Sequence, residues 1–218
     1  MVADANSCPP AISDSIEIEQ PEILIVDSIL VNNISCHNMD DGSIEVFVSG
    51  GTHPYTYTLN PGGIINNTGL FENLPAGTYS IDVVDSNNCY INAGPFTIIN
   101  PPALTIDSLT STDITCHDQN DGTITISASG GTGVLTYTLQ PPGTSNSTGY
   151  FENLSDGDYW IQVSDSNACQ IVSDTVTIVN PDAISTDALS STDITCHDQN
   201  DGTITISASG GTGALTYT

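Results

Sequence analysis

The chain has 218 residues, of which 26 are Asp or Glu and none is Lys or Arg, so its formal net charge at pH 7 is −26. This balance excludes nucleic-acid binding as a main function, because a phosphate backbone needs cationic partners. It also disfavours anionic membrane surfaces, and it removes Schiff-base catalysis and lysine-dependent phosphate loops. Apolar runs stay well below the roughly 18 residues of a membrane span, so we expect no membrane insertion in this segment.

The acidity does not predict disorder, because only 12% of the residues are charged and 38% are hydrophobic. The chain is rich in Ile, Val, Thr and Tyr, which suit the pleated and half-buried surface of a sheet. A disordered acidic tail would lack these residue types. The composition therefore predicts folded β-structure, and the length allows one to three domains.

An internal repeat of 80 residues organises the chain. The spacing is carried by the cysteines: Cys36, Cys116 and Cys196 in one series, and Cys89 and Cys169 in the other. Residues 111–138 recur as residues 191–218 with one change, Val134 to Ala214. Such near-identity indicates duplication within a tandem array.

Prolines mark the expected repeat boundaries, because proline ends strand pairing and stiffens the chain. No Gly/Ser-rich linker separates the repeats, so we expect stiff coupling between them. Neither end of the sequence coincides with a repeat boundary, which indicates a window from a longer array. The expected divisions are 1–18 as the C-terminal piece of a preceding repeat, 19–100 and 101–180 as complete repeats, and 181–218 as the N-terminal part of a third.

Within each repeat, apolar side chains alternate with a period of two, and no segment has a helical period. In the first repeat the predicted strands are 23–34, 43–49, 55–59, two strands across 64–74, 78–84 and 95–99. Short strands separated by Gly, Pro and Asn turns are typical of an all-β sandwich. We therefore predict an all-β fold of tandem immunoglobulin-like β-sandwich repeats of 80 residues, stacked end to end.

The segment Leu74–Tyr79, with the sequence Leu-Pro-Ala-Gly-Thr-Tyr, is typical of a tyrosine corner. In that motif a tyrosine hydroxyl fastens the crossover between the two sheets. The second repeat keeps Gly157 and Tyr159 at the same spacing. The pattern predicts that the Tyr79 hydroxyl fastens this crossover.

Three motifs of the first repeat carry a family resemblance. They are Cys-x4-Asp-Gly-Ser-Ile from Cys36, Gly-Gly-Thr-x-Pro-Tyr-Thr-Tyr from Gly50, and Leu-x-Ala-Gly-Thr-Tyr-x-Ile-x-Val-x-Asp-Ser-Asn-x-Cys ending at Cys89. Together they resemble the SprB-type repeat of long cell-surface gliding adhesins of Bacteroidota. The resemblance implies export through the type IX system, surface display, and adhesion or gliding. The second repeat departs from it where Val134-Leu135 replaces Pro-Tyr.

Six cysteines are disulfide candidates, since even spacing in an exported β-rich array is typical of disulfides. They are Cys8, Cys36, Cys89, Cys116, Cys169 and Cys196. Two pairings remain open at this point. Pairing within a repeat joins Cys36 to Cys89, but in an immunoglobulin-like sandwich these positions lie at opposite ends. End-to-end stacking instead brings Cys36 near Cys169, and buried free thiols are the remaining alternative.

Several predicted turns are rich in side-chain oxygen atoms, which indicates a possible calcium site, because calcium takes six to eight oxygen ligands. The candidate ligands are Asp40, Asp41, Asp118, Asp121 and Asp165. The alternative is ordinary turn chemistry of Asp, Asn and Gly together with solvation. No cofactor is expected to be required beyond this possible calcium at the joints between repeats.

A histidine follows each cysteine of one series, namely His37, His117 and His197. Zinc needs four ligands, and one Cys-His pair does not supply them, so we expect no zinc site here. The nucleophile-elbow motif Gly-x-Ser-x-Gly is absent, and near-identical tandem units are poor candidates for a single active site. The sequence therefore predicts a protein that is not an enzyme.

Short patterns also suggest glycosylation, although chance matches are frequent in a Ser/Thr/Asn-rich chain. Sequons for N-linked glycans occur at Asn33, Asn66, Asn146 and Asn153. The family resemblance implies O-linked acceptors at Ser15, Ser28, Ser108 and Thr175. The alternation of side chains along a strand places Phe47 and Trp160 on the solvent-facing side, so both are candidate contact residues.

Taken together, these features predict a structural segment of an exported tandem-repeat cell-surface fibre or adhesin, located outside the cell. The expected partners are neighbouring repeats of the same chain, laterally assembled copies, and surface glycans or a substratum bound through a distal region. The alternative is a β-sandwich module that binds glycan or calcium directly. Aromatic platforms that recur at outward positions would favour this alternative.

Overall fold

The computed structural model describes residues 16–218, which form strands β1–β17 and no helix. The chain divides into two compact units. The first contains Asp40–Ile99 and the described residues up to Asn33, and the second contains Ile34–Met39 and Asn100–Thr218. A search of the described residues for a helix long and apolar enough to cross a membrane finds none.

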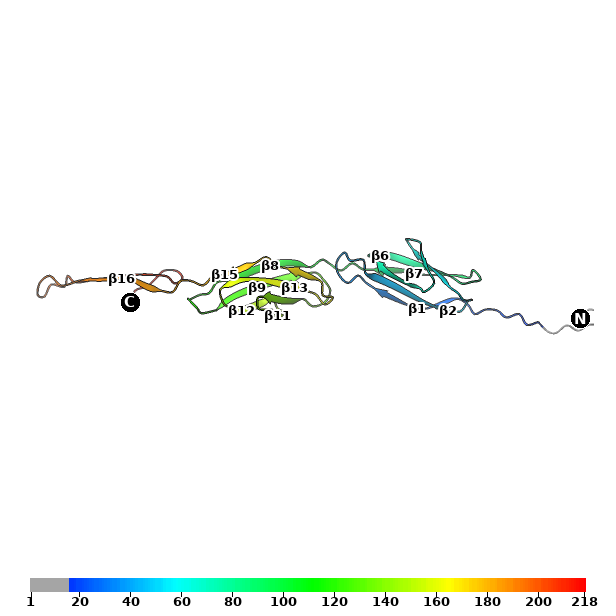
Figure 1. The fold of residues 1–218 in the computed structure, drawn as a ribbon, viewed down its shortest axis with the longest axis horizontal. Coiled ribbons are helices and arrows are strands. Elements are labelled where there is room, and N and C mark those ends of the chain that lie inside the picture. The colour runs from blue at the N-terminus through cyan, green and yellow to red at the C-terminus, as the bar shows by residue number, and fades with distance from the viewer. Residues whose placement is uncertain (1–15) are drawn as a thin grey trace, which may run out of the picture. The chain divides into compact units, whose positions relative to one another are not determined.

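The first unit is a seven-stranded sandwich (Figure 1). Its strands are β1 (Ile25–Asn32), β2 (Gly42–Ser49), β3 (Thr56–Asn60), β4 (Ile64–Asn66), β5 (Leu70–Leu74), β6 (Gly77–Val84) and β7 (Tyr90–Ile98). One sheet has the order β1-β2-β5 and the other β4-β3-β6-β7, and all neighbours are antiparallel. This is the A-B-E and C′-C-F-G arrangement of an immunoglobulin-like sandwich, which confirms the predicted fold class.

The second unit repeats this arrangement and adds one further strand pair. Its strands are β8 (Thr105–Thr112), β9 (Gly122–Ser129), β10 (Thr136–Gln140), β11 (Thr144–Asn146), β12 (Tyr150–Leu154), β13 (Gly157–Ser164), β14 (Gln170–Val172), β15 (Val176–Ile178), β16 (Ser185–Thr192) and β17 (Thr203–Ser209). The first sheet is β12-β9-β8, and the second is β11-β10-β13-β14 with β15 also paired to β13. Strands β16 and β17 form a sheet of their own.

Period-two alternation decides which side chains form each core. In the first unit Ile44 and Ile81 have no exposed surface, and their chain neighbours alternate outward. In the second unit Ile124, Ile161 and Val163 are fully buried in the same way. These three side chains belong to the core cluster of the second unit, whose other members are Ile114, Ile126, Tyr137, Leu139, Phe151, Tyr159 and Ile178.

The last strand of the first repeat begins earlier than the sequence predicts. The prediction placed it at 95–99, after the Gly94-Pro95 pair, but β7 begins at Tyr90. The pairing shifts register opposite Tyr79 and Ile81, and Gly94 there has a φ of 130°. A bulge accommodates a proline that has no N–H to donate, so the strand continues through it. In the second repeat the equivalent segment is split into β14 and β15.

Both tyrosine corners are present. The Tyr79 hydroxyl donates to the Pro75 carbonyl at 2.9 Å, and the Tyr159 hydroxyl donates to the Ser155 carbonyl at 3.0 Å. Each tyrosine side chain is buried, so its hydroxyl forms its hydrogen bond with a backbone carbonyl instead of with water. The prediction drawn from the Gly-x-Tyr spacing is confirmed.

Replacing Tyr159 by Phe is expected to lower the free energy of unfolding of the second unit by about 1 kcal/mol, the usual value of a lost hydrogen bond. Urea unfolding followed by fluorescence of Trp160, the one tryptophan of the chain, measures this change. Tyr150→Phe is the matched control, because that side chain is 46% exposed. Equal stability of the two variants would contradict a stabilising corner.

Candidate functional site

A disulfide joins Cys36 to Cys169, with their Cα atoms 5.6 Å apart. Both cysteines belong to the second unit, because that unit includes Ile34–Met39. The bond links a cysteine of the first sequence repeat to one of the second, and 133 residues separate them in the chain. Of the two pairings that the sequence left open, the structure contains the one between repeats.

The turn that carries Cys169 is organised by a buried carboxylate. Asp165 is 7% exposed, and its Oδ1 accepts the backbone N–H groups of Asn167 and Cys169, each at 2.9 Å. Its Oδ2 accepts the N–H of Thr132 at 2.7 Å. Three N–H donors offset the cost of burying the charge, so this acid has a structural role.

The first repeat builds the same turn around Asp85, which is 4% exposed. Asp85 accepts N–H groups from Thr52 at 2.8 Å, Asn87 at 2.9 Å and Cys89 at 2.7 Å. Burial raises the pKa of this carboxyl, but the backbone hydrogen bonds outweigh it and leave the pKa below its usual value. The Asp-x-Asn-x-Cys pattern is therefore a turn motif that presents the cysteine.

The turn that carries Cys36 is held by residues at the boundary between the two repeats and by one residue of the second repeat. The ring nitrogen Nδ1 of His37 donates to the carbonyl of Pro101 at 2.8 Å. The N–H of Asn38 donates to Oδ1 of Asn100 at 3.0 Å. The carbonyl of Ser35 accepts the side-chain amide of Asn167 at 2.8 Å. These contacts hold Cys36 beside the turn that carries its partner.

The equivalent turn around Cys116 keeps two of these contacts. Nδ1 of His117 donates to the carbonyl of Pro181 at 2.8 Å, and the N–H of Asp118 donates to Oδ1 of Asn180 at 3.1 Å. His37 and His117 thus anchor their turns to the boundary prolines. The residue pattern alone does not reveal these partners, although the spacing of 64 residues from each of these two histidines to a boundary proline recurs in both repeats.

Three other cysteines in the described chain are free thiols, namely Cys89, Cys116 and Cys196, and all three are exposed. Burial and the neighbouring Asp85 carboxylate raise the pKa of the Cys89 thiol, which favours its protonated form. Cys8 lies outside the described residues. Cys89 nevertheless lies in the turn equivalent to that of Cys169, and Cys116 lies in the turn equivalent to that of Cys36.

The calcium hypothesis stays a prediction. Within residues 16–218, no group of three or more His, Cys, Asp or Glu is arranged to hold a metal ion. Asp165 uses its oxygens on backbone donors, and Asp121 accepts the N–H of Thr115 at 2.9 Å and its hydroxyl at 2.5 Å. These bonds hold the pKa of Asp121 below its usual value. Asp40 and Asp41 belong to the first unit, and Asp165 belongs to the second.

The glycosylation candidates lie in different settings. Asn66 and Asn146 close their own turns, since the side-chain amide of each donates to a backbone carbonyl, of Leu70 at 2.8 Å and of Tyr150 at 2.9 Å. Asn33 accepts the N–H of Ile99. The remaining described candidates, Asn153, Ser28, Ser108 and Thr175, are exposed, and Ser15 lies outside the described residues.

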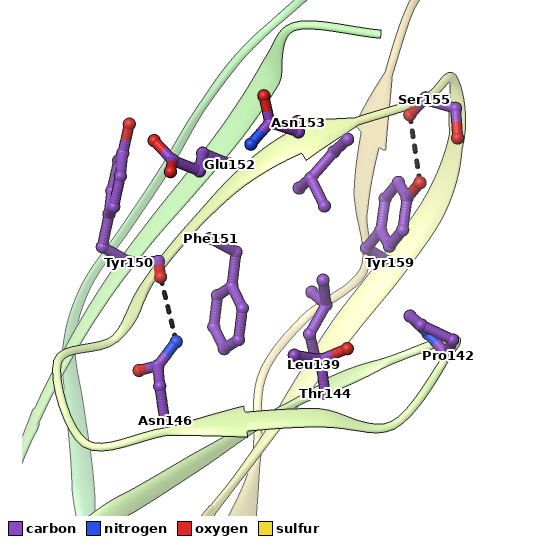
Figure 2. A pocket seen from close by; sticks show the side chains of 11 residues that line it. Leu139, Pro142, Thr144, Asn146, Tyr150, Phe151, Glu152, Asn153, Ser155 and Tyr159 are labelled. Atoms are coloured by element: carbon purple, nitrogen blue, oxygen red, sulfur yellow. Dashed lines mark hydrogen bonds between the residues drawn. The ribbon is translucent and has the colours of Figure 1, made fainter.

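A groove of about 440 Å³ opens beside β12 in the second unit (Figure 2). Leu139, Phe151 and Leu154 supply its apolar surface, and Tyr150, Glu152 and Asn153 supply exposed polar groups. The β12 ladder shifts register between Phe151 and Leu154, and Asn153 has a φ of 59°. Such a bulge changes the direction of the side chains beside it, and this bulge borders the groove.

Comparison with known proteins finds a repeat family. The family model described as the SprB repeat matches three segments of the chain, residues 29–63, 108–144 and 188–218. The chain carries SprB repeats. No curated protein matches it.

One solved structure similar to the chain is the C-terminal 282-residue fragment of intimin, crystallised in complex with the intimin-binding domain of the translocated intimin receptor (Tir). The two share 16% identity with a TM-score of 0.39, and the match covers 75% of this chain and 67% of that one.

The SprB repeats of this chain differ in the polar groups on the outer face of one sheet. In the first repeat, Asp82 accepts the Tyr90 hydroxyl and the Asn92 amide at 2.7 Å each, and the Asn60 amide at 2.8 Å. The Asn92 and Tyr90 hydrogen bonds lower the pKa of Asp82, burial opposes them, and Asn60 lowers it further. The second repeat has Gln162 at the position of Asp82.

Asp82 makes the stability of the first SprB repeat depend on acid pH. Its pKa is lower in the folded than in the unfolded chain, where it is about 3.9, so its contribution is present above that pH and is lost as the pH falls through the folded value. We expect the first repeat of the Asp82→Asn variant to lose less of its stability than the native repeat does as the pH falls. Amide hydrogen exchange between pH 2 and 6 measures this difference. The second repeat, with Gln162 there, is the internal control and should not change.

The outward aromatic residues are exposed as predicted, Phe47 at 45% and Trp160 at 36%. Each has a serine at the equivalent position of the other repeat, Ser127 and Ser80. Neither therefore recurs from one SprB repeat to the next. Single exposed aromatics are ordinary surface features.

Proposed function

We propose that this chain is a load-bearing segment of an exported cell-surface fibre or adhesin that serves adhesion or gliding. Support comes from three matches to the SprB repeat and from two immunoglobulin-like sandwiches that share the same strand order. Tandem β-sandwiches are a common way to extend a surface protein. In this role the chain acts as a non-enzymatic spacer outside the cell, and neighbouring repeats are its first partners.

The observation that carries this proposal is the Cys36–Cys169 disulfide. It connects two successive sequence repeats covalently, so tension on the chain acts on a cross-linked segment. The chain has no lysine, so lysine–asparagine crosslinks are not available to stiffen it. Disulfides are favoured in oxidising compartments, which supports a position outside the cell.

Surface labelling tests the proposal. An antibody raised against the 218-residue chain should label intact cells of the bacterium that encodes it, and proteolysis of the intact cells should remove the label. An in-frame deletion of this segment should then reduce attachment or gliding while the rest of the protein is still displayed. Labelling that appears only after permeabilisation would refute the proposal.

A second candidate function is direct glycan binding, which the groove beside β12 favours. Ligand sites are concave and mostly apolar, with a few polar groups that fix orientation, and this groove combines Phe151 with Glu152 and Asn153. A glycan array with the chain and with a Tyr150→Ala/Glu152→Ala variant tests it. Specific binding that the variant loses would support this function, and the absence of any binding would exclude it for the glycans present.

A further inference from the structure

The first unit contains a groove that is lined by aromatic rings, and we call it the aromatic groove. Its volume is about 450 Å³, and its exposed lining includes Phe47, His53 and Pro54. Tyr55 and Tyr57 belong to its buried lining, at 8% and 5% exposed. All of these residues belong to the first unit, so the groove lies within one sandwich.

Three polar side chains also line the aromatic groove, and they are Asp27, Asn67 and Thr68. Asp27 is exposed, and its Oδ1 accepts the hydroxyl of Ser49 at 2.7 Å. The N–H of Thr68 donates to Oδ1 of Asn66 at 3.0 Å, which closes the turn that carries Asn67. The groove therefore offers a carboxylate, an amide and a hydroxyl beside its rings.

Contacts within the first unit hold the rings of the aromatic groove in place. The His53 ring lies against the Tyr55 ring, with their centroids 4.1 Å apart. The Tyr55 and Tyr57 rings meet edge to face, with centroids 6.4 Å apart, and the Tyr55 hydroxyl donates to the carbonyl of Gly50. A site that is preformed in this way loses little conformational freedom when a ligand binds.

Ring side chains distinguish the aromatic groove from the equivalent surface of the other repeats. The second and third repeats have serine in place of Phe47 and glycine in place of His53. They have Val-Leu and Ala-Leu in place of the pair Pro54-Tyr55, whereas both keep an aspartate at the position of Asp27. The first repeat therefore adds ring surface beside a carboxylate that all three repeats share. Phe47 is one member of this group and not a single exposed aromatic residue.

The charge of the chain restricts the ligand of this groove. The formal net charge is −26 with no Lys or Arg, and the Asp27 carboxylate lies on the groove, so anionic ligands are repelled. A neutral sugar ring matches the lining. Its C–H groups carry partial positive charge that complements the negative face of an aromatic ring. Its hydroxyls donate to carboxylate and amide oxygens, which fix its orientation.

We propose that the aromatic groove binds a pyranose ring of a neutral glycan, with the C–H face of the sugar on Phe47 and its hydroxyls bonded to Asp27 and Asn67. This goes beyond a load-bearing role, because it makes the first repeat a binding module within the array. It does not rest on the groove beside β12, which belongs to the second unit and is lined by different residues.

Saturation-transfer NMR on the full 218-residue chain tests the proposal, with the methyl glycosides of glucose, galactose and mannose as probes. We expect at least one of them to bind, with the strongest saturation on its ring C–H protons. The uronic-acid form of that sugar should bind about tenfold more weakly, because its carboxylate meets Asp27. Asp27→Asn should reduce this difference.

Phe47→Ser installs the residue of the other repeats and should weaken binding of the neutral sugar about tenfold. Two matched controls should leave binding unchanged. Trp160→Ser removes the exposed aromatic residue of the second repeat, and Tyr150→Ala/Glu152→Ala alters the groove beside β12. Unchanged thermal unfolding of the Phe47→Ser chain confirms that this variant alters the groove alone.

The proposal is overturned if none of the three glycosides binds, if the Phe47→Ser chain binds as tightly as the native chain, or if the uronic-acid form binds as tightly as the neutral sugar. Loss of binding in the Tyr150→Ala/Glu152→Ala chain would also overturn it, because the sugar would then lie beside β12. Binding of a decaproline peptide instead of the sugars, lost in Phe47→Ser, would assign the groove to an extended polypeptide.

Discussion

Replacing Cys36 by Ser is expected to lower the free energy of unfolding of the second unit by about 2–4 kcal/mol. The bond closes a long loop, since 133 residues separate its cysteines, and removing it releases the conformational freedom of the unfolded chain. Urea unfolding followed by Trp160 fluorescence measures the change. Chemical reduction of the native chain should give the same loss.

Cys116→Ser is the matched control for this prediction. That cysteine occupies the equivalent turn one repeat later and is a free, exposed thiol, so its replacement should leave stability within about 0.5 kcal/mol of the native value. Peptide mapping without reduction should recover Cys36 joined to Cys169. Mapping that recovers Cys36 joined to Cys89, or equal stability of the two variants, would contradict the pairing.

Replacing Asp165 by Ala is expected to lower the free energy of unfolding of the same unit by about 3 kcal/mol or more. Three backbone N–H groups, of Thr132, Asn167 and Cys169, lose the acceptor that the buried Asp165 carboxylate provides. The turn also positions Cys169, so the Cys36–Cys169 disulfide should form more slowly in refolding from the reduced state. Denaturant unfolding and timed thiol trapping measure the two effects.

Two further variants separate the causes of this effect. Asp165→Asn keeps one acceptor oxygen and should restore part of the stability. Asp156→Ala removes the same charge from an exposed position and should have little effect. An Asp165→Ala chain as stable as the Asp156→Ala chain would show that the carboxylate is not needed to hold the turn.

Local periodicity was sufficient to predict the β-sandwich. Alternation in segments such as Ser43–Ser49 places Ile44 and Val46 on one face, and both are buried. The Gly-x-Tyr spacing was sufficient for the tyrosine corner, because that motif depends on residues close in the chain. The start of β7 was missed because a proline pattern does not reveal whether a bulge will accommodate it.

The sequence by itself determined the 80-residue period, the all-β fold and the six disulfide candidates, since each depends on local pattern or on counting. Only the tertiary structure selected the Cys36–Cys169 pairing, because a disulfide needs its Cα atoms within about 7 Å and such proximity depends on how distant turns pack. The tertiary structure also placed Asp165 as the acceptor of three backbone N–H groups, a role that the sequence did not predict.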